Sequence, residues 1–504
     1  MKIFIKTASI GVYRVSTALV LAVVLISLSG TGAWCQQGWQ TDVRLSDDPS
    51  ISFPPPNNGR CIAVDGDGRV HVVWADDRDR NFEIYHTYRS GGIWSMPERL
   101  TTSAEDSKRP VLAVDGLGRV HLVWNDLRDG NKEIYHRIWD GSWGFETRVS
   151  DTPGDSYASC IVSRGLEIHL VYQEEVDGYL QIIYRSFDVF TWSAPEQVSF
   201  VESGMSMVPT IAVEPGGRIH VAWWDTREDP GGGAPGKVAY RYRDGTWSDE
   251  EIVSGPEADA MRPNICVDDS GVVHVAWIDK REPFEQIYYN RCEEGGWTGE
   301  VLLTGGDFTH YHPSLSLSAG RVHLVYWANL PSAANPGVFY MQSDYSSWTG
   351  SQRISDPLSI ASLCAMTAEP NGTLHVAWKD LRDGNEEIYY NTYIPPGTGT
   401  GDTEDPSLPD LTETPISVDI SPNPSTGEST ISFSIPRVTR LDIRIYDAAG
   451  RLVRTLADGT SFQGTRSFVW DGRNDRGAPV ARGVYFIRGR AGKQRIAAKL
   501  LLIR

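Results

Sequence analysis

Residues 110–150 read PVLAVDGLGRVHLVWNDLRDGNKEIYHRIWDGSWGFETRVS, and similar stretches recur along most of the chain. Four short runs in this stretch have the composition of β-strands, VLAVD, RVHLVW, EIYHRI and ETRVS, and glycine and aspartate turns separate them. The copies align on one histidine of the second run, with steps of 48 to 54 residues. The seven copies place this histidine at His71, His121, His169, His220, His274, His323 and His375.

Four strands in each repeat of this length are typical of one propeller blade. The sequence therefore predicts an all-β chain whose body, residues 36–394, is a seven-bladed β-propeller. The seventh copy runs into IPPGTGTG without an outer strand, whereas residues 39–46, WQTDVRLS, match the outer strand of the first copy, WSMPERLT at 94–101. We expect this N-terminal strand to complete the last blade and to cover its sheet edge.

The first 35 residues have the layout of a secretory signal peptide. Lys2, Lys6 and Arg14 precede an apolar run at 18–28, and small residues follow it. A run of 11 residues is short for a transmembrane helix, which needs about 20. We expect a mature chain that starts near Gln36, carries no transmembrane anchor, and is extracellular or attached to the outer-membrane surface.

Charge and cysteine content narrow the classes of partner. The formal net charge is −18, and residues 414–504 contribute +8 to it, so the remainder of the chain is strongly acidic. An acidic body argues against nucleic-acid binding, which uses positive surfaces. The six cysteines show no paired spacing, which indicates buried free thiols. We expect a monomer with no metal and no cofactor.

Residues that recur from blade to blade in most of the copies are interpreted as scaffold. In the second copy these are His121, Trp124, Asp126 and Arg128. Equivalent histidines around a ring lie too far apart to share one metal ion. We expect Asp126 to hold its turn through backbone amides and Arg128 to pair with Glu133 of the third strand. The alternative is a ring of guanidinium groups that binds carboxylates or sulfates.

Positions where the repeat breaks are better candidates for ligand binding, because a ligand seldom shares the symmetry of the scaffold. The third copy replaces the Asp-x-Arg turn with acidic residues, the fourth lengthens the loop, and the sixth replaces the turn with an aromatic one. Aromatic, imidazole and acidic groups gathered on one face of the propeller suit the binding of a sugar or a peptide. Ordinary variation of loop sequences is the alternative explanation. The candidates are Glu174, Glu175, Trp224, His310, His312, Trp327, Arg109 and Arg262.

Three classes of function remain open. The chain lacks a Gly-x-Ser-x-Gly, His-Glu-x-x-His or phosphate-binding motif, which favours a binding propeller for a glycan or a surface protein, with no catalytic residue. A glycan-cleaving hydrolase or lyase that uses Glu174 with the arginines or His312 is the rival. A structural or adhesive protein without a pocket is the third hypothesis.

The repeats resemble the sialidase-like propellers of secreted bacterial proteins, and RDGTWS at 243–248 is similar to a shortened Asp-box. The resemblance implies glycan chemistry on a propeller. The Arg-Ile-Pro motif of sialidases is absent from this sequence, and the full Asp-box spacing is not met. The resemblance therefore does not carry over the catalytic residues of sialidases.

The tail, residues 416–504, indicates an immunoglobulin-like β-sandwich. It carries SPNPSTGESTISFSIP at 421–436, LDIRIYDAAGRLVRTL at 441–456 and WDGRNDRGAPVARGVYFIRG at 470–489. These motifs resemble the C-terminal sorting domain of the type IX secretion system and the immunoglobulin-like domain of flagellar hook-capping proteins. The first resemblance implies export through outer-membrane secretion machinery. Residues 395–415 form the predicted flexible linker.

Overall fold

The computed structural model describes residues 38–55, 60–227, 235–294, 296–330, 335–395, 417–423, 425–447, 451–491 and 494–503. Every regular element in these ranges is a β-strand, and they contain no helix long and apolar enough to cross a membrane. The chain divides into two compact units, Met1–Thr400 and Gly401–Arg504. The predicted signal peptide and nearly all of the predicted linker lie outside the described residues.

The described residues of the first unit form seven separate antiparallel sheets, and each sheet has an inner, a second, a third and an outer strand. The inner strands are β3 (Ile62–Val64), β8 (Ser107–Val114), β12 (Ser156–Arg164), β16 (Ser206–Val213), β21 (Ala260–Val267), β26 (Thr309–Ser318) and β30 (Ala361–Ala368). The second strands are β4 (Val70–Asp76), β9 (Val120–Asp126), β13 (Glu167–Val176), β17 (Ile219–Asp225), β22 (Val273–Asp279), β27 (Arg321–Asn329) and β31 (Leu374–Asp380).

The third and outer strands complete these sheets. The third strands are β5 (Glu83–Ser90), β10 (Glu133–Trp139), β14 (Tyr179–Phe187), β18 (Lys237–Asp244), β23 (Gln286–Glu293), β28 (Gly337–Ser343) and β32 (Glu387–Tyr393). The outer strands are β7 (Glu98–Arg99), β11 (Thr147–Arg148), β15 (Glu196–Gln197), β20 (Glu251–Ile252), β25 (Val301–Leu302), β29 (Gln352–Arg353) and β1 (Val43–Arg44). Four further short strands are β2 (Ser52–Phe53), β6 (Ile93–Trp94), β19 (Thr246–Trp247) and β24 (Gly296–Trp297).

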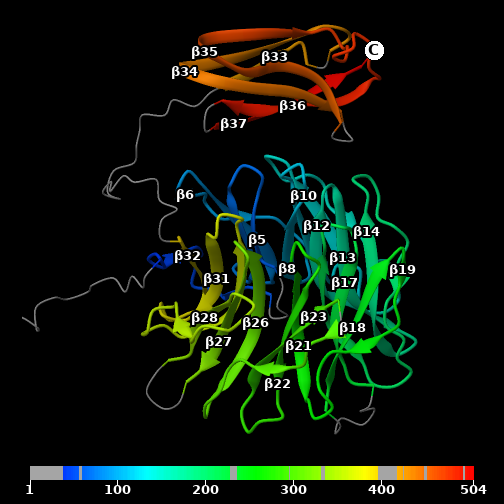
Figure 1. The fold of residues 1–504 in the computed structure, drawn as a ribbon, viewed down its shortest axis with the longest axis vertical. Helices are drawn as coiled ribbons and strands as arrows, with labels where there is room; N and C mark the ends of the chain where they lie inside the picture. Colours follow the sequence, from blue (N-terminus) through cyan, green and yellow to red (C-terminus); the bar gives the residue numbers. More distant parts are fainter. Residues whose placement is uncertain are drawn as a thin grey trace, which may run out of the picture. The chain divides into compact units, whose positions relative to one another are not determined.

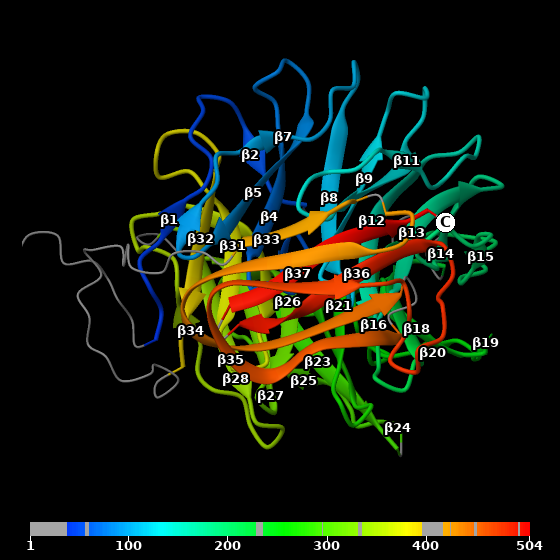
Figure 2. The same cartoon turned by 90° about the horizontal axis from the view of Figure 1, so that it is seen from above.

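Successive sheets pack through their inner strands. β8 contacts β12, β12 contacts β16, and the series continues through β21, β26 and β30. β30 also contacts β3, and β3 contacts β8, so the order of contacts returns to its start. Figure 1 shows the blue strand β5 of the first sheet close to the yellow strands β31 and β32 of the last, and Figure 2 shows the same neighbours from above.

The N-terminal segment belongs to the last sheet, where the sequence places it. β1 pairs antiparallel with β32, and Trp39 forms a bridge with Tyr393. The Trp39 side chain is buried and lies edge-on to Tyr340, with 5.4 Å between ring centroids. Arg44 forms an ion pair with the buried Glu387 at 2.6 Å. Residues from the two ends of the first unit therefore share one sheet and one core.

The second strands are apolar on both faces because both faces are covered. Val120, Leu122 and Trp124 have no exposed surface, and neither do His121 and Val123 on the opposite face. A strand buried on both sides reads as a continuous apolar run rather than an alternation. The core around these strands joins neighbouring sheets, since one cluster holds residues of the first, second and last repeats.

The repeat histidines are buried and hydrogen-bonded within the sheets. His121 Nδ1 lies 3.0 Å from His136 Nε2 of the third strand, and His121 Nε2 lies 3.3 Å from Asp115. In the last sheet His375 Nδ1 pairs with Tyr390 Oη at 2.6 Å. Burial lowers the pKa of His121, so this imidazole is neutral near pH 7. In the part of the chain that the structure describes, no group of three or more His, Cys, Asp or Glu residues is arranged to hold a metal ion.

The Asp-x-Arg turn holds an internal ion pair, and the expected pairing of Arg128 with Glu133 is wrong. Asp126 accepts bonds from Arg128 Nε at 2.9 Å, Nη2 at 2.6 Å and backbone N at 3.0 Å. Glu133 pairs instead with Arg148 of β11, at 2.9 Å. The turn folds each arginine back over the aspartate two residues before it, so these guanidinium groups already have carboxylate partners. The same pairing joins Asp76 to Arg78, Asp225 to Arg227, Asp279 to Arg281 and Asp380 to Arg382.

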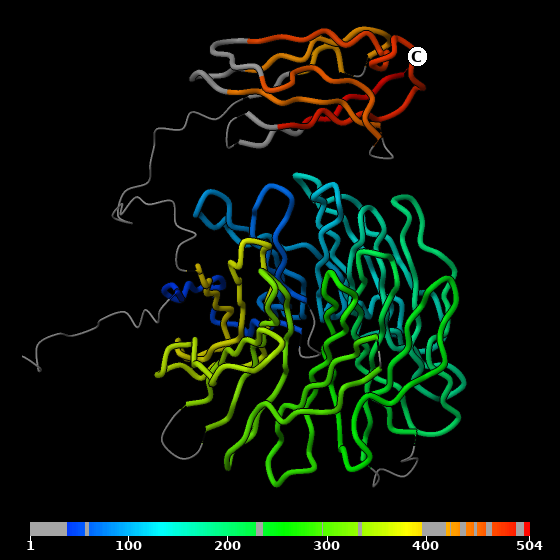
Figure 3. Tube along the Cα trace, viewed as in Figure 1, coloured from blue at the N-terminus to red at the C-terminus, as the bar shows by residue number. Residues whose placement is uncertain are grey.

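The second unit is a five-stranded antiparallel sheet that folds around its own core. Its strands are β33 (Ser417–Ser421), β34 (Ser429–Asp447), β35 (Leu452–Trp470), β36 (Gly483–Ala491) and β37 (Gln494–Leu502). β34 pairs with β35 along most of its length, and its other edge pairs first with β33 and then with β36. Phe433, Ile443, Trp470 and Tyr485 are buried between these strands. Figure 3 traces this unit from orange to red.

We expect the substitution Trp39→Ala to lower the free energy of unfolding of the first unit by roughly 3–5 kcal/mol, because it removes a fully buried indole. Val43→Ala is the matched control, since Val43 lies in the same segment but is 37% exposed. Urea denaturation followed by circular dichroism measures both variants. Equal unfolding midpoints for the two variants would show that the N-terminal strand adds no stability to the last sheet.

Candidate functional site

The inner strands share a bulge that sets one residue of each repeat apart. In six of the described inner strands the register shifts at the same place, and the bulged residue has a φ between 48° and 57°. Few residues other than glycine adopt this conformation, and strain of this kind is concentrated at functional sites. A bulge also re-aims a side chain away from the regular pleat. The residues are Arg109, Ala158, Val208, Arg262, His312 and Leu363.

Three of these bulged residues carry cationic or imidazole side chains that lie close to one another. Arg262 Nη1 lies 3.3 Å from His312 Nε2. Burial lowers the pKa of Arg109, and the charge of Arg262 lowers it further. The three side chains come from the second, fifth and sixth repeats, so strands far apart in the sequence bring them together. We call Arg109, Arg262 and His312 the arginine–histidine cluster.

Aromatic rings lie beside the arginine–histidine cluster. Arg109 Cζ lies 5.5 Å from the centre of the Tyr157 ring. Tyr311 stacks on Trp327 with 4.6 Å between ring centroids, and the His312 ring lies 6.4 Å from Trp327 and nearly parallel to it. Trp327 belongs to β27, where it pairs with Tyr311. The sequence had placed Trp327 in a loop, and the structure corrects this, because the second strand of the sixth repeat continues to Asn329.

The arginine–histidine cluster combines two guanidinium charges with a neutral imidazole. Burial, assisted by the charge of Arg262, lowers the pKa of His312 to about 3. Its Nε2 is therefore unprotonated near pH 7 and accepts a hydrogen bond from Arg262. Arginine stays protonated in proteins even when burial lowers its pKa. Arg109 forms no ion pair with any described residue, so its partly buried charge is open to an anion.

Two residues near the arginine–histidine cluster were not singled out from the sequence. Arg60 Nη2 lies 3.3 Å from the carbonyl oxygen of Ile211 and 3.5 Å from that of Ile265, so it reaches from the first repeat to the fourth and fifth. Tyr157 is the second. Alignment of the repeats on their histidines places Tyr157 in the position of Tyr311 and Arg60 in the position of Pro110. This alignment is the sequence signal that could have pointed to the two residues.

Glu174 replaces the scaffold aspartate, and the hypothesis that it marks a binding site is not supported by its contacts. Ser156 Oγ donates to Glu174 at 3.0 Å, as Ser107 Oγ donates to Asp126 at 2.8 Å. Glu174 is buried, and within its own sheet it pairs with Ser156 of the inner strand and Gln181 of the third strand. The neighbouring Glu175 is exposed at the end of β13. In the described part of the chain, neither carboxylate forms a hydrogen bond or an ion pair with the arginine–histidine cluster.

His310 and Trp224 also lie apart from the arginine–histidine cluster. His310 takes the position that Ser107 has in the second repeat, and it packs on Phe308 and Tyr326, with 4.8 and 5.6 Å between ring centroids. Burial lowers its pKa to about 4. Trp224 lies at the end of β17 and packs against Gly236, where an added Cβ would lie 2.3 Å from Trp224 Nε1. Of the eight candidates, the structure brings together Arg109, Arg262, His312 and Trp327.

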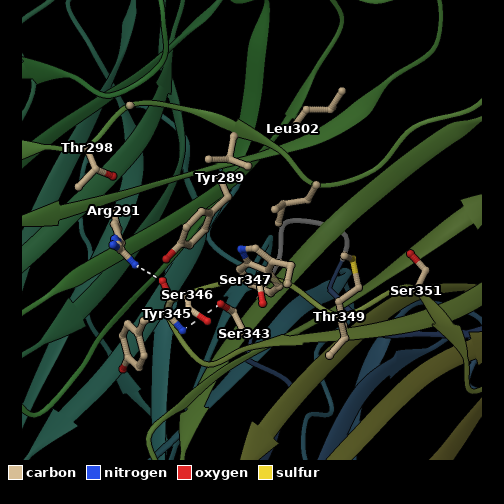
Figure 4. A pocket seen from close by; sticks show the side chains of 16 residues that line it. Tyr289, Arg291, Thr298, Leu302, Ser343, Tyr345, Ser346, Ser347, Thr349 and Ser351 are labelled. Atoms are coloured by element: carbon tan, nitrogen blue, oxygen red, sulfur yellow. Dashed lines mark hydrogen bonds between the residues drawn. The ribbon is translucent and has the colours of Figure 1, made fainter.

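A separate cavity of about 650 Å³ lies where the fifth and sixth repeats meet. Tyr289, Arg291, Trp348, Val301 and Leu302 contribute to its lining. Figure 4 shows its side chains, with a dashed line for the 2.7 Å bond from Arg291 to the carbonyl oxygen of Tyr345. The lining comes from third and outer strands and their connections, so this cavity is distinct from the arginine–histidine cluster on the inner strands.

Residues 419–493 match the family model of the FlgD Ig-like domain. This match covers most of the second unit and identifies an Ig-like domain there. No curated protein matches the chain.

Solved structures similar to the chain include polysaccharide lyases. An ulvan lyase of a new lyase family, bound to -[GlcA(1-4)Rha3S]-, has a TM-score of 0.53 at 12% identity and covers 69% of this chain and 95% of its own. A second ulvan lyase structure has a TM-score of 0.52 at 12% identity, with 71% and 95% covered. These likenesses concern the fold alone. PorZ, a surface component of the type-IX secretion system of Porphyromonas gingivalis, has a TM-score of 0.37 at 16% identity, with 89% and 60% covered, which is too low to support an inference.

Asp126 and Glu174 occupy equivalent positions, yet their pKa values shift in opposite directions. Burial alone would raise the pKa of Asp126, but hydrogen bonds from Arg128, Ser107 and Trp124 outweigh it and lower the pKa. Burial raises the pKa of Glu174, which lacks an arginine partner at the turn. Ionised Asp126 therefore stabilises the fold above its unfolded pKa, and this contribution is lost as the pH falls through its folded pKa. Ionised Glu174 destabilises the fold at pH 7.

We expect Asp126→Asn to lower the free energy of unfolding at pH 7 by roughly 3 kcal/mol, since it breaks a buried ion pair. Glu174→Gln should leave it unchanged or raise it, because it removes a carboxylate whose ionised form is disfavoured. Urea denaturation at pH 7 compares the two variants directly. An equal loss in both would mean that Glu174 has the same ionic role as Asp126.

Proposed function

We propose that the first unit is a seven-bladed β-propeller that binds an acidic glycan, a polysaccharide with carboxylate or sulfate groups, at the arginine–histidine cluster. The observation that carries this proposal is the approach of Arg109 and Arg262 from different repeats, with Arg109 open to an anion among the described residues. The closed order of contacts between the sheets and the pairing of β1 with β32 support seven blades.

The chemistry of the cluster suits a charged sugar. Guanidinium groups bind carboxylates and sulfates through paired, charge-assisted hydrogen bonds. Tyr157, Tyr311 and Trp327 offer ring faces on which a sugar could pack. The carboxylate would take the place of the missing ion-pair partner of Arg109, and the sugar ring would lie against the aromatic side chains.

The ligand of the similar ulvan lyase belongs to the same chemical class, because its repeat contains glucuronate and a sulfated rhamnose. That likeness is one of fold, and the contacts of Arg109, Arg262 and His312 support the proposal for this chain. The rival reading of a purely adhesive protein does not account for a partly buried guanidinium group that has no ion pair among the described residues.

We further propose that the chain is exported and acts outside the cell or on its surface. The charged and apolar pattern of residues 1–35 supports a signal peptide. The second unit would act as a sorting domain of the type IX secretion system, and the match to the FlgD Ig-like domain supports the domain type. The machinery of the outer membrane would then be its partner.

We expect Arg109→Ala and Arg262→Ala each to weaken the binding of polygalacturonate or dextran sulfate by roughly tenfold or more, because each removes a charge-assisted contact. Isothermal titration calorimetry with the mature chain measures this, with neutral dextran as the ligand control. Arg164→Ala is the matched control, since Arg164 is an exposed arginine at the other end of β12. Equal weakening by Arg164→Ala would indicate general charge attraction and contradict a defined site.

A lyase is the second candidate function, and the neutral imidazole beside Arg262 favours it. His312 Nε2 would accept the C5 proton of a bound uronate while Arg262 binds the carboxylate that carries the developing charge. The electron pair of the C–H bond would form the C4–C5 double bond, the C4–O bond would break, and the departing oxygen would take a proton from Tyr157 or water. The negative charge of the bound carboxylate would raise the low pKa of His312 and make it a stronger base.

We expect that, if the chain is a lyase, polygalacturonate or ulvan incubated with it gains the ultraviolet absorbance of an unsaturated uronate. His312→Gln should then abolish this signal and leave binding within a few-fold of the original chain, because a general base acts mainly on turnover. If the unsubstituted chain binds a polysaccharide but produces no such absorbance, the lyase function is wrong and only the binding function remains.

A further inference from the structure

The seams between neighbouring sheets repeat one contact on their outer side. A tryptophan from one repeat packs on the third strand of the repeat before it, and in two seams its indole nitrogen donates to a carboxylate on the outer strand of that repeat. Elsewhere Trp143 donates to His86, and the buried Nε1 atoms of Trp94 and Trp192 have no partner among the described residues. Trp247 Nε1 donates to Glu196 Oε2 at 3.1 Å, and Trp297 Nε1 donates to Glu251 Oε2 at 2.9 Å. Glu196 and Glu251 are the first residues of β15 and β20. In these two seams the carboxylate satisfies the indole N–H.

The seam between the fifth and sixth repeats lacks this carboxylate. β25 begins with Val301 where β15 and β20 begin with glutamate. Trp348 is the equivalent tryptophan, since it packs edge-on against Tyr289 at 5.1 Å. Its Nε1 has no hydrogen-bond partner among the described residues. The N–H donor that the other two seams satisfy internally is therefore left for another acceptor.

The cavity at this seam has two kinds of surface. Val301 and Leu302 form an apolar wall, and they are 49% and 46% exposed. Hydroxyl groups border the cavity on another side, from Thr298, Ser343, Ser346, Ser347, Thr349 and Ser351. The volume of about 650 Å³ falls in the range of small-ligand sites, about 300–1,000 Å³.

The cavity carries almost no net charge. Among the described residues that line it there is no aspartate or glutamate, and Arg291 is the one with a charge. Arg291 is already engaged, because it pairs with Glu293 at 2.9 Å and donates to the carbonyl oxygen of Tyr345 at 2.7 Å. An anion would gain little in this cavity. A ligand with apolar C–H faces and hydroxyl edges matches its walls.

We propose that this seam is a second binding site, for a neutral saccharide. One face of a sugar ring packs against Val301, Leu302 and the aromatic side chains, and its hydroxyl groups exchange hydrogen bonds with the serine and threonine rim. The Trp348 indole donates to a sugar hydroxyl where the seams of Trp247 and Trp297 supply glutamate. The site lies on third and outer strands, so it is separate from the arginine–histidine cluster and stands whether or not that cluster binds an acidic glycan.

The substitution Val301→Glu tests the site by introducing the carboxylate that the seams of Trp247 and Trp297 have. The introduced glutamate gives Trp348 Nε1 an acceptor inside the protein and puts a charge on the apolar wall. Saturation-transfer difference NMR of the mature chain with cellohexaose, xylohexaose and mannohexaose provides the readout. We expect at least one of these oligosaccharides to bind the unsubstituted chain, and Val301→Glu to weaken that binding at least tenfold with an unchanged or higher Tm.

Two further variants keep the test decisive. Glu251→Val makes the opposite change at the preceding seam and should leave binding unchanged. Ser347→Phe fills the cavity from an exposed position and replaces Val301→Glu if that variant does not fold. The proposal is wrong if none of the three oligosaccharides binds at millimolar concentration, if binding survives in both cavity variants, or if Arg109→Ala abolishes it, since the sugar would then occupy the arginine–histidine cluster.

Discussion

The first unit depends on a buried carboxylate at the end of each regular second strand. Asp126 accepts hydrogen bonds from Ser107 of the inner strand, from Trp124 of its own strand and from Arg128 of the following turn. One buried charged group thus links two strands and a turn. A buried charge is tolerated only when its partners are complete, so the serine, tryptophan, aspartate and arginine recur together. This requirement explains why the repeats remain recognisable over the length of the propeller-like unit.

The repeats that lose this set differ in what replaces it. The third repeat retains a carboxylate, Glu174, with its serine partner but without the arginine. The sixth repeat has lost the whole set: His310 and Tyr326 fill the space with rings, and Ala328 stands where the aspartate would be. In the sixth repeat Trp327 stacks beside His312, whereas Arg109 and Arg262 come from repeats that keep the aspartate–arginine pair. The residues of the cluster therefore come from repeats that keep this pair as well as from one that has lost it.

The two proposed sites differ in charge, and this difference separates their ligands. The chain is acidic, with a formal net charge of −18, so a polyanion is repelled at a distance. Salt screens that repulsion beyond about 8 Å at physiological ionic strength, and the partly buried guanidinium groups act at closer range. The outer seam offers an apolar wall and hydroxyl groups instead. An acidic chain that bears a cationic site selects anions by contact rather than by long-range attraction.

The sequence by itself determined the repeats, their strands, the place of the N-terminal strand and the unusual character of Arg109, Arg262 and His312, because these follow from local periodicity and from comparison of equivalent positions. Only the tertiary structure decided that these three side chains meet, that Arg128 binds Asp126 rather than Glu133, that Glu174 accepts a hydrogen bond from Ser156, and that Trp348 lacks the carboxylate that Trp247 and Trp297 have. Strand alternation predicts the side to which a residue points. A bulge resets that alternation, and contacts between repeats depend on distances that no single strand contains.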